Sequence, residues 1–253
     1  MLVAERYERI VQLVNERGSI RVSELSELFE VTEETIRRDL DKLEQAGRLR
    51  RSHGGAVSVK DHPVETPYFD REVVRVEEKK KIALEAVKLI QPHDRIILDA
   101  SSTAWYMAKS VPDIPLTVLT NSIKVAVELS SKEKVEVIST GGSLASRSLS
   151  YVGPLAERSL DTYHVDKAFL SCRGVHLEWG VSESNELQAR MKQKMIGIAD
   201  QVYLLADSSK FGTQALAQVV GWEEIGTVIS DNGISFEDVE RLQERSIEII
   251  RAE

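Results

Sequence analysis

The stretch Val31-Thr-Glu-Glu-Thr-Ile-Arg-Arg-Asp-Leu40 has the pattern of a short helix with one apolar side and one basic side. Thr32 is a typical N-cap residue, and the two glutamates that follow it lie where the helix dipole favours acids. Ile36 and Leu40 recur at helical spacing, so they can face a core. The other faces carry side chains that could contact the major groove of DNA: Thr35, Arg37 and Arg38. This pattern predicts a recognition helix.

A second basic stretch, Arg48-Leu-Arg-Arg-Ser-His-Gly-Gly55, follows this helix closely. Gly47 provides a helix stop, because glycine adopts the left-handed conformation at little cost. The arginines of the stretch can contact phosphates, and Gly54-Gly55 allows a tight turn that could approach a sugar-phosphate backbone. The stretch therefore predicts the basic wing of a winged helix-turn-helix.

Two more helices are expected before the recognition helix. Residues 4–14 have apolar side chains at helical spacing and are followed by Gly18, and Val22–Phe29 form a shorter helix with Ser23 as its N-cap. A pair of arginines on an isolated helix is more often a solvated face than a DNA-binding surface. Three short helices and a hairpin within residues 1–58, however, make a known DNA-binding arrangement whose last helix enters the groove.

The distribution of charge matters more for DNA binding than its total. The net charge is -8, but residues 37–60 contain seven basic and three acidic residues. A small basic surface beside a larger acidic part is compatible with local contact to DNA.

The composition indicates a cytoplasmic protein of two domains without a membrane partner. A chain of 253 residues exceeds a typical single domain. The single cysteine, Cys172, excludes an internal disulfide framework and is typical of a reducing compartment. The N-terminus lacks an apolar signal core, and no apolar run approaches the roughly 20 residues of a membrane helix.

The segment Lys60-Asp-His-Pro-Val-Glu-Thr-Pro67 has two prolines and no apolar period, which is typical of a linker. We therefore predict a winged helix-turn-helix domain at 1–58, a linker at 59–75 and a larger domain at 76–253. In the larger domain, short apolar runs alternate with helical segments, which predicts an α/β fold with a mostly parallel sheet covered on both faces. The expected strands are 95–98, 116–119, 135–138, 167–170, 202–205, 227–230 and 246–250; the expected helices are 75–90 (with Leu84 on its apolar side), 103–109, 123–131, 185–199 and 236–244.

Ligands of such sheets bind beyond the carboxyl ends of the strands. The first expected strand ends in Asp99-Ala-Ser-Ser-Thr103, where hydroxyl and N–H groups at a helix start can bind an anion. Four later strand ends are similarly polar, although one such end alone is more often a simple helix cap. A crevice shared by all five would suit a phosphorylated polyol, and its candidate ligands are Asp99, Ser101, Ser102, Thr103, Asn121, Gly141, Gly142, Asp207 and Lys210.

Residues 7–57 resemble the DNA-binding half of the DeoR family of bacterial transcriptional regulators. The resemblance rests on Val31-Thr32, on Thr35-Ile-Arg-Arg-Asp-Leu40 and on Leu49-Arg-Arg-Ser-His-Gly-Gly-Ala56. It implies that the recognition helix binds DNA through Thr32, Thr35, Arg37 and Arg38. It also implies that the wing binds DNA through Arg50, Arg51 and His53. Asp39 is expected to buttress an arginine.

Four strand ends resemble those of the family's effector domain, which is related in fold to ribose-5-phosphate isomerase and CoA transferases. They are Asp99-Ala-Ser-Ser-Thr103, Thr120-Asn121, Gly141-Gly142 and Asp207-Ser-Ser-Lys210. The resemblance implies that the second domain senses a phosphorylated sugar and controls the first. Gly180-Val-Ser-Glu-Ser-Asn-Glu186 is more acidic than the commoner pattern, so Glu183 joins the expected effector ligands. The first loop with Trp105-Tyr106 resembles regulators of deoxyhexose use, unless the two aromatic residues only pack between helices.

The alternative to a regulator is a sugar-phosphate isomerase-like enzyme fused to a DNA-binding domain. Asp99, Glu183 or Asp207 could supply a carboxylate base for proton transfer. The paired aspartates with a lysine- and glycine-rich loop of such isomerases are not visible, nor is a CoA-transferase glutamate. The five histidines are scattered, without a ligand pair at helical spacing. We therefore expect no catalytic residue, no metal and no cofactor.

These observations predict a repressor of a sugar-catabolic operon, with operator DNA and a phosphorylated sugar as its partners. Two or four identical subunits would present pairs of winged domains to two half-sites, since one such domain binds DNA weakly. The sugar phosphate would favour an arrangement of the winged domains that no longer matches the operator spacing.

Overall fold

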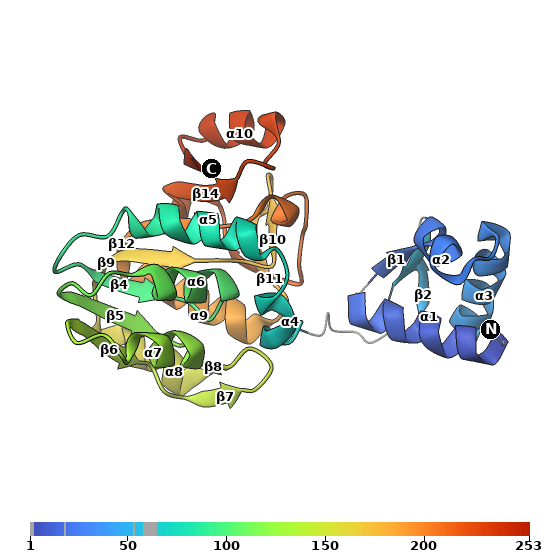
Figure 1. The fold of residues 1–253 in the computed structure, drawn as a ribbon, viewed down its shortest axis with the longest axis horizontal. Helices are drawn as coiled ribbons and strands as arrows, with labels where there is room; N and C mark the ends of the chain where they lie inside the picture. The colour runs from blue at the N-terminus through green and yellow to red at the C-terminus, as the bar shows by residue number, and fades with distance from the viewer. Residues whose placement is uncertain (1–2, 18, 53, 58–64) are drawn as a thin grey trace. The chain divides into compact units, whose positions relative to one another are not determined.

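The computed structural model describes residues 3–17, 19–52, 54–57 and 65–253, which fall into two compact units, 1–64 and 65–253 (Figure 1). Hydrophobic side chains form one core in the first unit and two in the second. Within the described ranges, no helix combines the length and the apolar character needed to cross a membrane.

The described residues of the first unit form three helices and an antiparallel sheet with the strand order β1-β3-β2. Its elements are α1 (Val3–Arg17), β1 (Ser19–Arg21), α2 (Val22–Phe29), α3 (Glu33–Gln45), β2 (Arg50–Ser52) and β3 (Gly55–Val57). The three helices meet in a core that includes Ile10, Leu13, Leu25, Ile36, Leu40 and Leu43. The winged helix-turn-helix that the sequence predicts is therefore present.

The ends of the recognition helix α3 follow the sequence signals. The side chain of Thr32 accepts a hydrogen bond from the Thr35 amide at 3.3 Å, and Gly47 follows the helix with a φ of 67°. The helix expected at Val22–Phe29 is confirmed as α2, but its expected N-cap is wrong, because Ser23 lies inside the helix and Arg21 occupies the N-cap without a side-chain bond. Strand β1 leads directly into α2, and the Val22 amide donates to the Gly54 carbonyl at 2.9 Å. The wing therefore fixes the start of α2.

Seven parallel strands form the central sheet of the second unit, in the order β15-β14-β12-β9-β4-β5-β6. They are β4 (Arg95–Leu98), β5 (Leu116–Thr120), β6 (Val135–Ser139), β9 (Val165–Leu170), β12 (Ala199–Leu205), β14 (Thr227–Asp231) and β15 (Glu248–Ala252). Each overlaps one of the expected strands, so the prediction of an α/β unit with a parallel sheet is confirmed.

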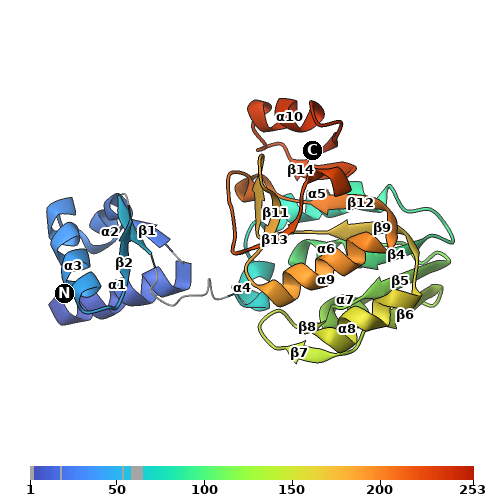
Figure 2. The ribbon, with the colours of Figure 1, turned by 180° about the vertical axis from the view of Figure 1, so that it is seen from behind.

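Helices cover both faces of this sheet. On one face lie α5 (Val76–Val87), α6 (Ser102–Ser110) and α7 (Ile123–Leu129), in front of the strands in Figure 1. On the other lie α8 (Pro154–Ser159) and α9 (Glu186–Gly197), seen in Figure 2, and Leu242 of α10 (Phe236–Gln243) joins the same core. Alternate residues of β4 enter the two cores, since successive side chains of a strand point to opposite faces.

Two small antiparallel sheets in the second unit were not expected from the sequence. One is the pair β7 (Ser143–Ala145) and β8 (Ser150–Val152), and the other contains β10 (Gly174–His176), β11 (Gly180–Glu183) and β13 (Ala217–Val220). Strands of three or four residues are too short to give a clear alternation of apolar and polar residues. Single 3-10 turns occupy Leu160–Thr162, Ser208–Lys210 and Trp222–Glu224.

The expected linker at 59–75 is wrong in its second half. Residues 65–75 belong to the second unit and include the short helix α4 (Tyr68–Glu72). The Tyr68 side chain is fully buried beside α5 and α6, and its amide donates to the Arg147 carbonyl at 2.7 Å. Pro67, one of the two prolines that indicated a linker, instead occupies the N-cap of this helix, and Pro63 lies outside the described residues.

The helix expected at 75–90 is shorter than predicted, and one of its apolar positions is wrong. Leu84 is 53% exposed, whereas Ile82, Ala83 and Ala86 are buried. The buried set follows the i, i+1, i+4 pattern of a helix side that rests on the sheet.

Candidate functional site

The outer surface of α3 carries two arginines, each paired with a glutamate one turn earlier. Arg37 Nη2 lies 2.6 Å from Glu33 Oε2, and Arg38 Nε lies 3.3 Å from Glu34 Oε1. The Arg38 side chain is 75% exposed. Exposed ion pairs of this kind contribute little free energy, so phosphates or base edges can displace the glutamates.

The threonines and the aspartate of α3 have local structural partners. The hydroxyls of Thr32 and Thr35 lie 2.9 Å apart at the start of the helix, where both could reach a groove. Asp39 is buried and accepts a hydrogen bond from Arg6 Nε at 2.6 Å. The expectation that Asp39 buttresses an arginine is confirmed, and the partner comes from α1.

The wing is fastened to α3 through Arg51. Its amide donates to Glu44 Oε1 at 2.7 Å, and its guanidinium pairs with Asp41. Arg51 therefore lies where the wing meets the recognition helix. Of the other predicted wing residues, Arg50 lies in β2 with a side chain outside the description, and His53 lies outside the described residues.

The two wing glycines have different roles. Gly54 has a φ of 87° in the turn, with open space around it. A Cβ on Gly55 would lie 2.1 Å from the Ile20 carbonyl oxygen, so only glycine lets β3 pair with β1 here. The glycine pair therefore shapes the hairpin whether or not it approaches DNA.

The second unit contains a cavity of about 240 Å³ at the carboxyl ends of β4, β9 and β12. Residues 65–79, which include α4 and the start of α5, supply its other wall. Six of the predicted effector residues line it: Ser101, Ser102, Thr103, Glu183, Asp207 and Lys210. Such a position matches the general rule for open parallel sheets.

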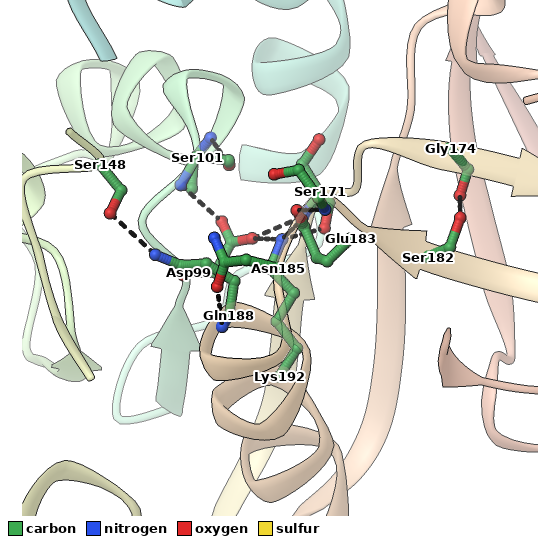
Figure 3. A network of polar contacts seen from close by, with 12 residues as sticks. Asp99, Ser101, Ser148, Ser171, Gly174, Ser182, Glu183, Asn185, Gln188 and Lys192 are labelled. Carbon is green, nitrogen blue, oxygen red and sulfur yellow. Dashed lines mark hydrogen bonds and ion pairs between the residues drawn. The ribbon is translucent and has the colours of Figure 1, made fainter. Parts of the chain in front are cut away.

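The end of β4 brings the start of α6 to the cavity. Ser101 caps the helix by accepting from the Ala104 amide at 3.0 Å. The amides of Ser102 and Thr103 lie in the first turn and have no intrahelical acceptor, so they can bind an anion. Asp99 does not line the cavity; its carboxylate accepts from the amides of Ser101 at 3.1 Å and Ser171 at 2.9 Å (Figure 3).

Lys192 of α9 holds two carboxylates together beside the cavity. Its Nζ lies 2.8 Å from Asp99 Oδ2 and 2.6 Å from Glu183 Oε1, and it donates to the Ser171 carbonyl at 2.5 Å (Figure 3). Burial lowers the pKa of Lys192, but the two carboxylates outweigh burial and hold the pKa above its ordinary value. All three ammonium protons have acceptors, so Lys192 positions the carboxylates instead of acting as a base.

Sequence reasoning missed Lys192, although a signal was present. Gln188 and Lys192 occupy helix positions that periodicity assigns to the buried side, next to Met191 and Met195. Gln188 also has inward partners, donating to the hydroxyls of Ser148 at 2.8 Å and Ser150 at 3.0 Å. Polar residues on an apolar helix side indicate a buried polar network.

One end of the cavity is rich in cations. Lys79 donates to the carbonyls of Arg71 at 2.5 Å and Val74 at 2.7 Å, and Arg75 Nε lies 3.7 Å from Asp207 Oδ1. Burial and then the charge of Lys210 lower the pKa of Lys79 to about 8. Clustered cations beside a helix start favour an anionic ligand.

The other end of the cavity is rich in hydrogen-bond acceptors. Glu65 Oε2 accepts from Asn185 Nδ2 at 3.1 Å, and burial raises the pKa of Glu65 above its ordinary range. Glu183 and Gln188 also line the cavity. Burial raises the pKa of the Cys172 thiol to about 12, so this cysteine is not a reactive thiolate.

The crevice expected from five strand ends is corrected to three. Asn121 lies under β8, where its side chain donates to the Tyr151 carbonyl at 3.0 Å. Gly141 and Gly142 have φ values of 61° and 114°, and a Cβ on Gly142 would lie 2.8 Å from Ala156 of α8. These residues lie outside the cavity lining, because β7, β8 and α8 cover the ends of β5 and β6.

The aromatic pair after the first loop packs between helices. Trp105 Nε1 donates to Glu128 at 3.1 Å, and the Tyr106 hydroxyl donates to the Glu72 carbonyl at 3.1 Å. Across the described residues, no group of three or more His, Cys, Asp or Glu side chains could hold a metal ion.

Two family models match the chain. The DeoR-like helix-turn-helix domain matches residues 6–62, and the DeoR C-terminal sensor domain matches residues 74–232. One match lies in each of the two units described above.

Several curated proteins are similar to nearly the whole chain. An uncharacterised HTH-type transcriptional regulator of Bacillus subtilis, YulB, is 55% identical over 98% of this chain and 96% of its own length. The L-fucose operon activator of Haemophilus influenzae is 41% identical over 90% of this chain and 92% of its own length. The transcriptional repressor AccR of Agrobacterium fabrum is 33% identical over 90% of each chain.

Among solved structures, ribose 5-phosphate isomerase A from Methanocaldococcus jannaschii is similar to part of the chain. The identity is 20%, the TM-score is 0.39, and 53% of each chain is covered.

Proposed function

This chain belongs to the DeoR family of transcriptional regulators, DNA-binding proteins and not enzymes, and we propose that it represses a sugar-catabolic operon under the control of a sugar phosphate. The first unit would bind the operator through Thr32, Thr35, Arg37 and Arg38 of α3 and through Arg50, Arg51 and His53 of the wing. The second unit would bind the sugar phosphate in the cavity at the ends of β4, β9 and β12.

The observation that carries this proposal is that one cavity is lined both by cations beside a helix start and by carboxylates. Lys79, Lys210 and the start of α6 would bind a phosphate, because charge-assisted hydrogen bonds to an anion are stronger than neutral ones. Glu65 and Glu183 at the other end would accept hydrogen bonds from sugar hydroxyls. A ligand that is anionic at one end and rich in hydroxyls at the other fits both.

The relatives guide the choice of sugar and the sign of regulation. An L-fucose operon activator at 41% identity favours a phosphorylated deoxyhexose as the first ligand to test. Repression is the simpler mode of regulation. A protein that occupies an operator already blocks transcription, whereas an activator must also contact the transcription machinery. AccR, a repressor, shows that this sign occurs among the relatives.

We further propose that the protein acts in the cytoplasm as a homodimer or homotetramer. Two winged domains would bind two half-sites, because a single domain of this size makes too few contacts for tight binding. The sugar phosphate would have to bind the operator-incompetent arrangement more tightly, since a ligand shifts an equilibrium only through its difference in affinity.

Thermal unfolding with phosphorylated and free sugars tests the ligand class. A sugar phosphate should raise the melting temperature, whereas the free sugar should have little effect. Lys210→Ala and Ser102→Glu should each weaken the ligand's effect, and Arg158→Gln, which removes an exposed charge on α8, should not. All three variants should still bind an operator selected from randomised duplexes. If Lys210→Ala protein releases its operator at the wild-type ligand concentration, the proposed phosphate site is wrong.

A further inference from the structure

Arg71 of α4 contributes a buried guanidinium to the wall of the cavity. Its Nε and Nη2 atoms are shielded from solvent, and neither has a hydrogen-bond acceptor within the described part of the chain. A buried donor without an acceptor destabilises a protein by about 1–3 kcal/mol, and more for a charged group. Such a group therefore indicates a missing anionic or polar acceptor.

The acid of the lining whose charge interacts with Arg71 already accepts a hydrogen bond from another residue. Glu65 interacts with Arg71 only through its charge, and its Oε2 atom accepts from Asn185 at 3.1 Å. The Arg71 guanidinium lies over the Tyr68 ring, with 5.6 Å between Cζ and the ring centroid. Tyr68 is fully buried, so this stacking holds the guanidinium at the cavity wall.

Hydrogen bonds to backbone carbonyls in and just after α4 hold this segment in place. Lys79 donates to the Arg71 and Val74 carbonyls, and the Tyr106 hydroxyl donates to the Glu72 carbonyl at 3.1 Å. These contacts hold the helix without using the Arg71 donors. Nε and Nη2 form one edge of the guanidinium, and this edge can bind two oxygens of a phosphate at once.

We propose that Arg71 binds the anionic group of the effector through two parallel hydrogen bonds, donated by Nε and Nη2. The inference rests on the proposed function of the cavity, and it adds a residue that the strand-end motifs do not contain. Lys210 and the amides of Ser102 and Thr103 would bind the remaining oxygens. The segment 65–75, which sequence reasoning assigned to a linker, is then part of the ligand site.

This role gives α4 a place in signal transmission. It is the first element of the second unit, so it lies directly after the residues that lead from the DNA-binding unit along the chain. An anion bound by Arg71 adds two hydrogen bonds to this helix. Effector binding thereby stabilises the first helix of the second unit.

The test compares Arg71→Gln with Arg158→Gln, an exposed arginine on α8 outside the cavity. Calorimetric titration uses ribose 5-phosphate, fructose 1-phosphate, fructose 6-phosphate and a 6-deoxyketohexose 1-phosphate, each beside its free sugar. For the phosphate that wild-type protein binds, Arg71→Gln should raise Kd about 10- to 100-fold. Arg158→Gln should stay within about twofold of wild type. The ligand concentration that half-maximally changes operator affinity should rise by the same factor.

The outcomes separate the two proposals. If wild-type protein binds none of the phosphorylated sugars, the proposed function of the cavity and the role of Arg71 both fail. If wild-type protein binds one and Arg71→Gln binds it equally well, only the role of Arg71 fails. Thermal unfolding of the second unit reports whether Arg71→Gln folds; if it does not, Arg71→Lys keeps the charge but loses the two-donor edge. Wild-type affinity in that variant also overturns the inference.

Discussion

Arg6 Nε lies 2.6 Å from Asp39 Oδ2, with both side chains almost fully buried where α1 meets α3. This ion pair ties the first helix to the recognition helix on the buried side of α3. Asp39 follows Arg37 and Arg38 directly in the sequence, so the pair fixes the rotation of the helix that presents them.

Breaking this pair on one side should destabilise the first unit strongly. Asp39→Asn leaves the Arg6 charge buried without its carboxylate and should lower the free energy of unfolding by about 3–5 kcal/mol. Glu34→Gln, which removes an exposed partner of Arg38, should change it by less than about 1 kcal/mol. Urea unfolding, with hydrogen exchange of α1 and α3 amides, measures both. A loss below about 1 kcal/mol for Asp39→Asn would contradict the structural role of the pair.

The recognition helix and the wing should differ in how they affect DNA binding. Arg38→Ala should weaken binding to the selected operator by about 1–3 kcal/mol, with a smaller effect on unrelated duplexes, if the side chain reads a base. Arg51→Ala should weaken binding to all duplexes and flatten the salt dependence, because it removes a cation and frees the wing from Asp41. Fluorescence anisotropy over a series of salt concentrations separates these effects. Unchanged operator affinity in an Arg37→Ala, Arg38→Ala double variant would exclude α3 as the reading helix.

The two wing glycines offer a matched pair of substitutions. Gly55→Ala places a Cβ 2.1 Å from the Ile20 carbonyl oxygen, so β1 and β3 must separate, and we expect a loss of more than about 3 kcal/mol. Gly54→Ala meets open space and should lose only about 1–2 kcal/mol for its left-handed backbone. Thermal unfolding of the two variants ranks them. Equal losses would show that the β1–β3 pairing tolerates the added methyl group.

The elements of the fold that could be predicted from the sequence are those whose sequence patterns lie within a few neighbouring residues. Each of the seven strands of the sheet contains a short apolar stretch, and Thr32 caps α3 through a residue three positions away. Burial on both faces of the sheet gives central strands such as β4 a continuous apolar run, so their positions along the chain are clear.

The parts that could not be predicted depend on contacts between distant segments. Arg71 lies in a proline-flanked stretch, and its burial follows from the docking of Tyr68 beside α5 and α6. Asn121 and Ser101 have similar local surroundings at strand ends, but β8 covers only Asn121. No local pattern distinguishes a strand end that opens into a cavity from one that another segment covers.

Lys79 should make effector binding depend on pH above neutrality. Burial and the charges of Lys210 and Arg71 lower its pKa to about 8, against the opposing charges of Asp207 and Glu78. A bound phosphate raises this pKa again, so binding takes up a proton once the pH exceeds about 8. Affinity should therefore be level between about pH 7 and 8, where the phosphate is mostly dianionic, and fall above pH 8 by up to about tenfold per unit.

The same lowered pKa of Lys79 makes folding stability change with pH in the opposite direction to effector affinity. Unfolded Lys79 keeps its proton up to its ordinary pKa of 10.5, so the unfolded chain binds more protons between about pH 8 and 10.5, and this residue's contribution to stability rises there. Lys79→Met should remove both effects, whereas Lys81→Met, at an exposed position of the same helix, should keep them. Between pH 7 and about 9.5, calorimetric titration measures how effector affinity changes with pH, and thermal unfolding measures how stability changes with pH. A wild-type effector affinity that stays constant over this range would show that the ligand's anion does not lie near Lys79.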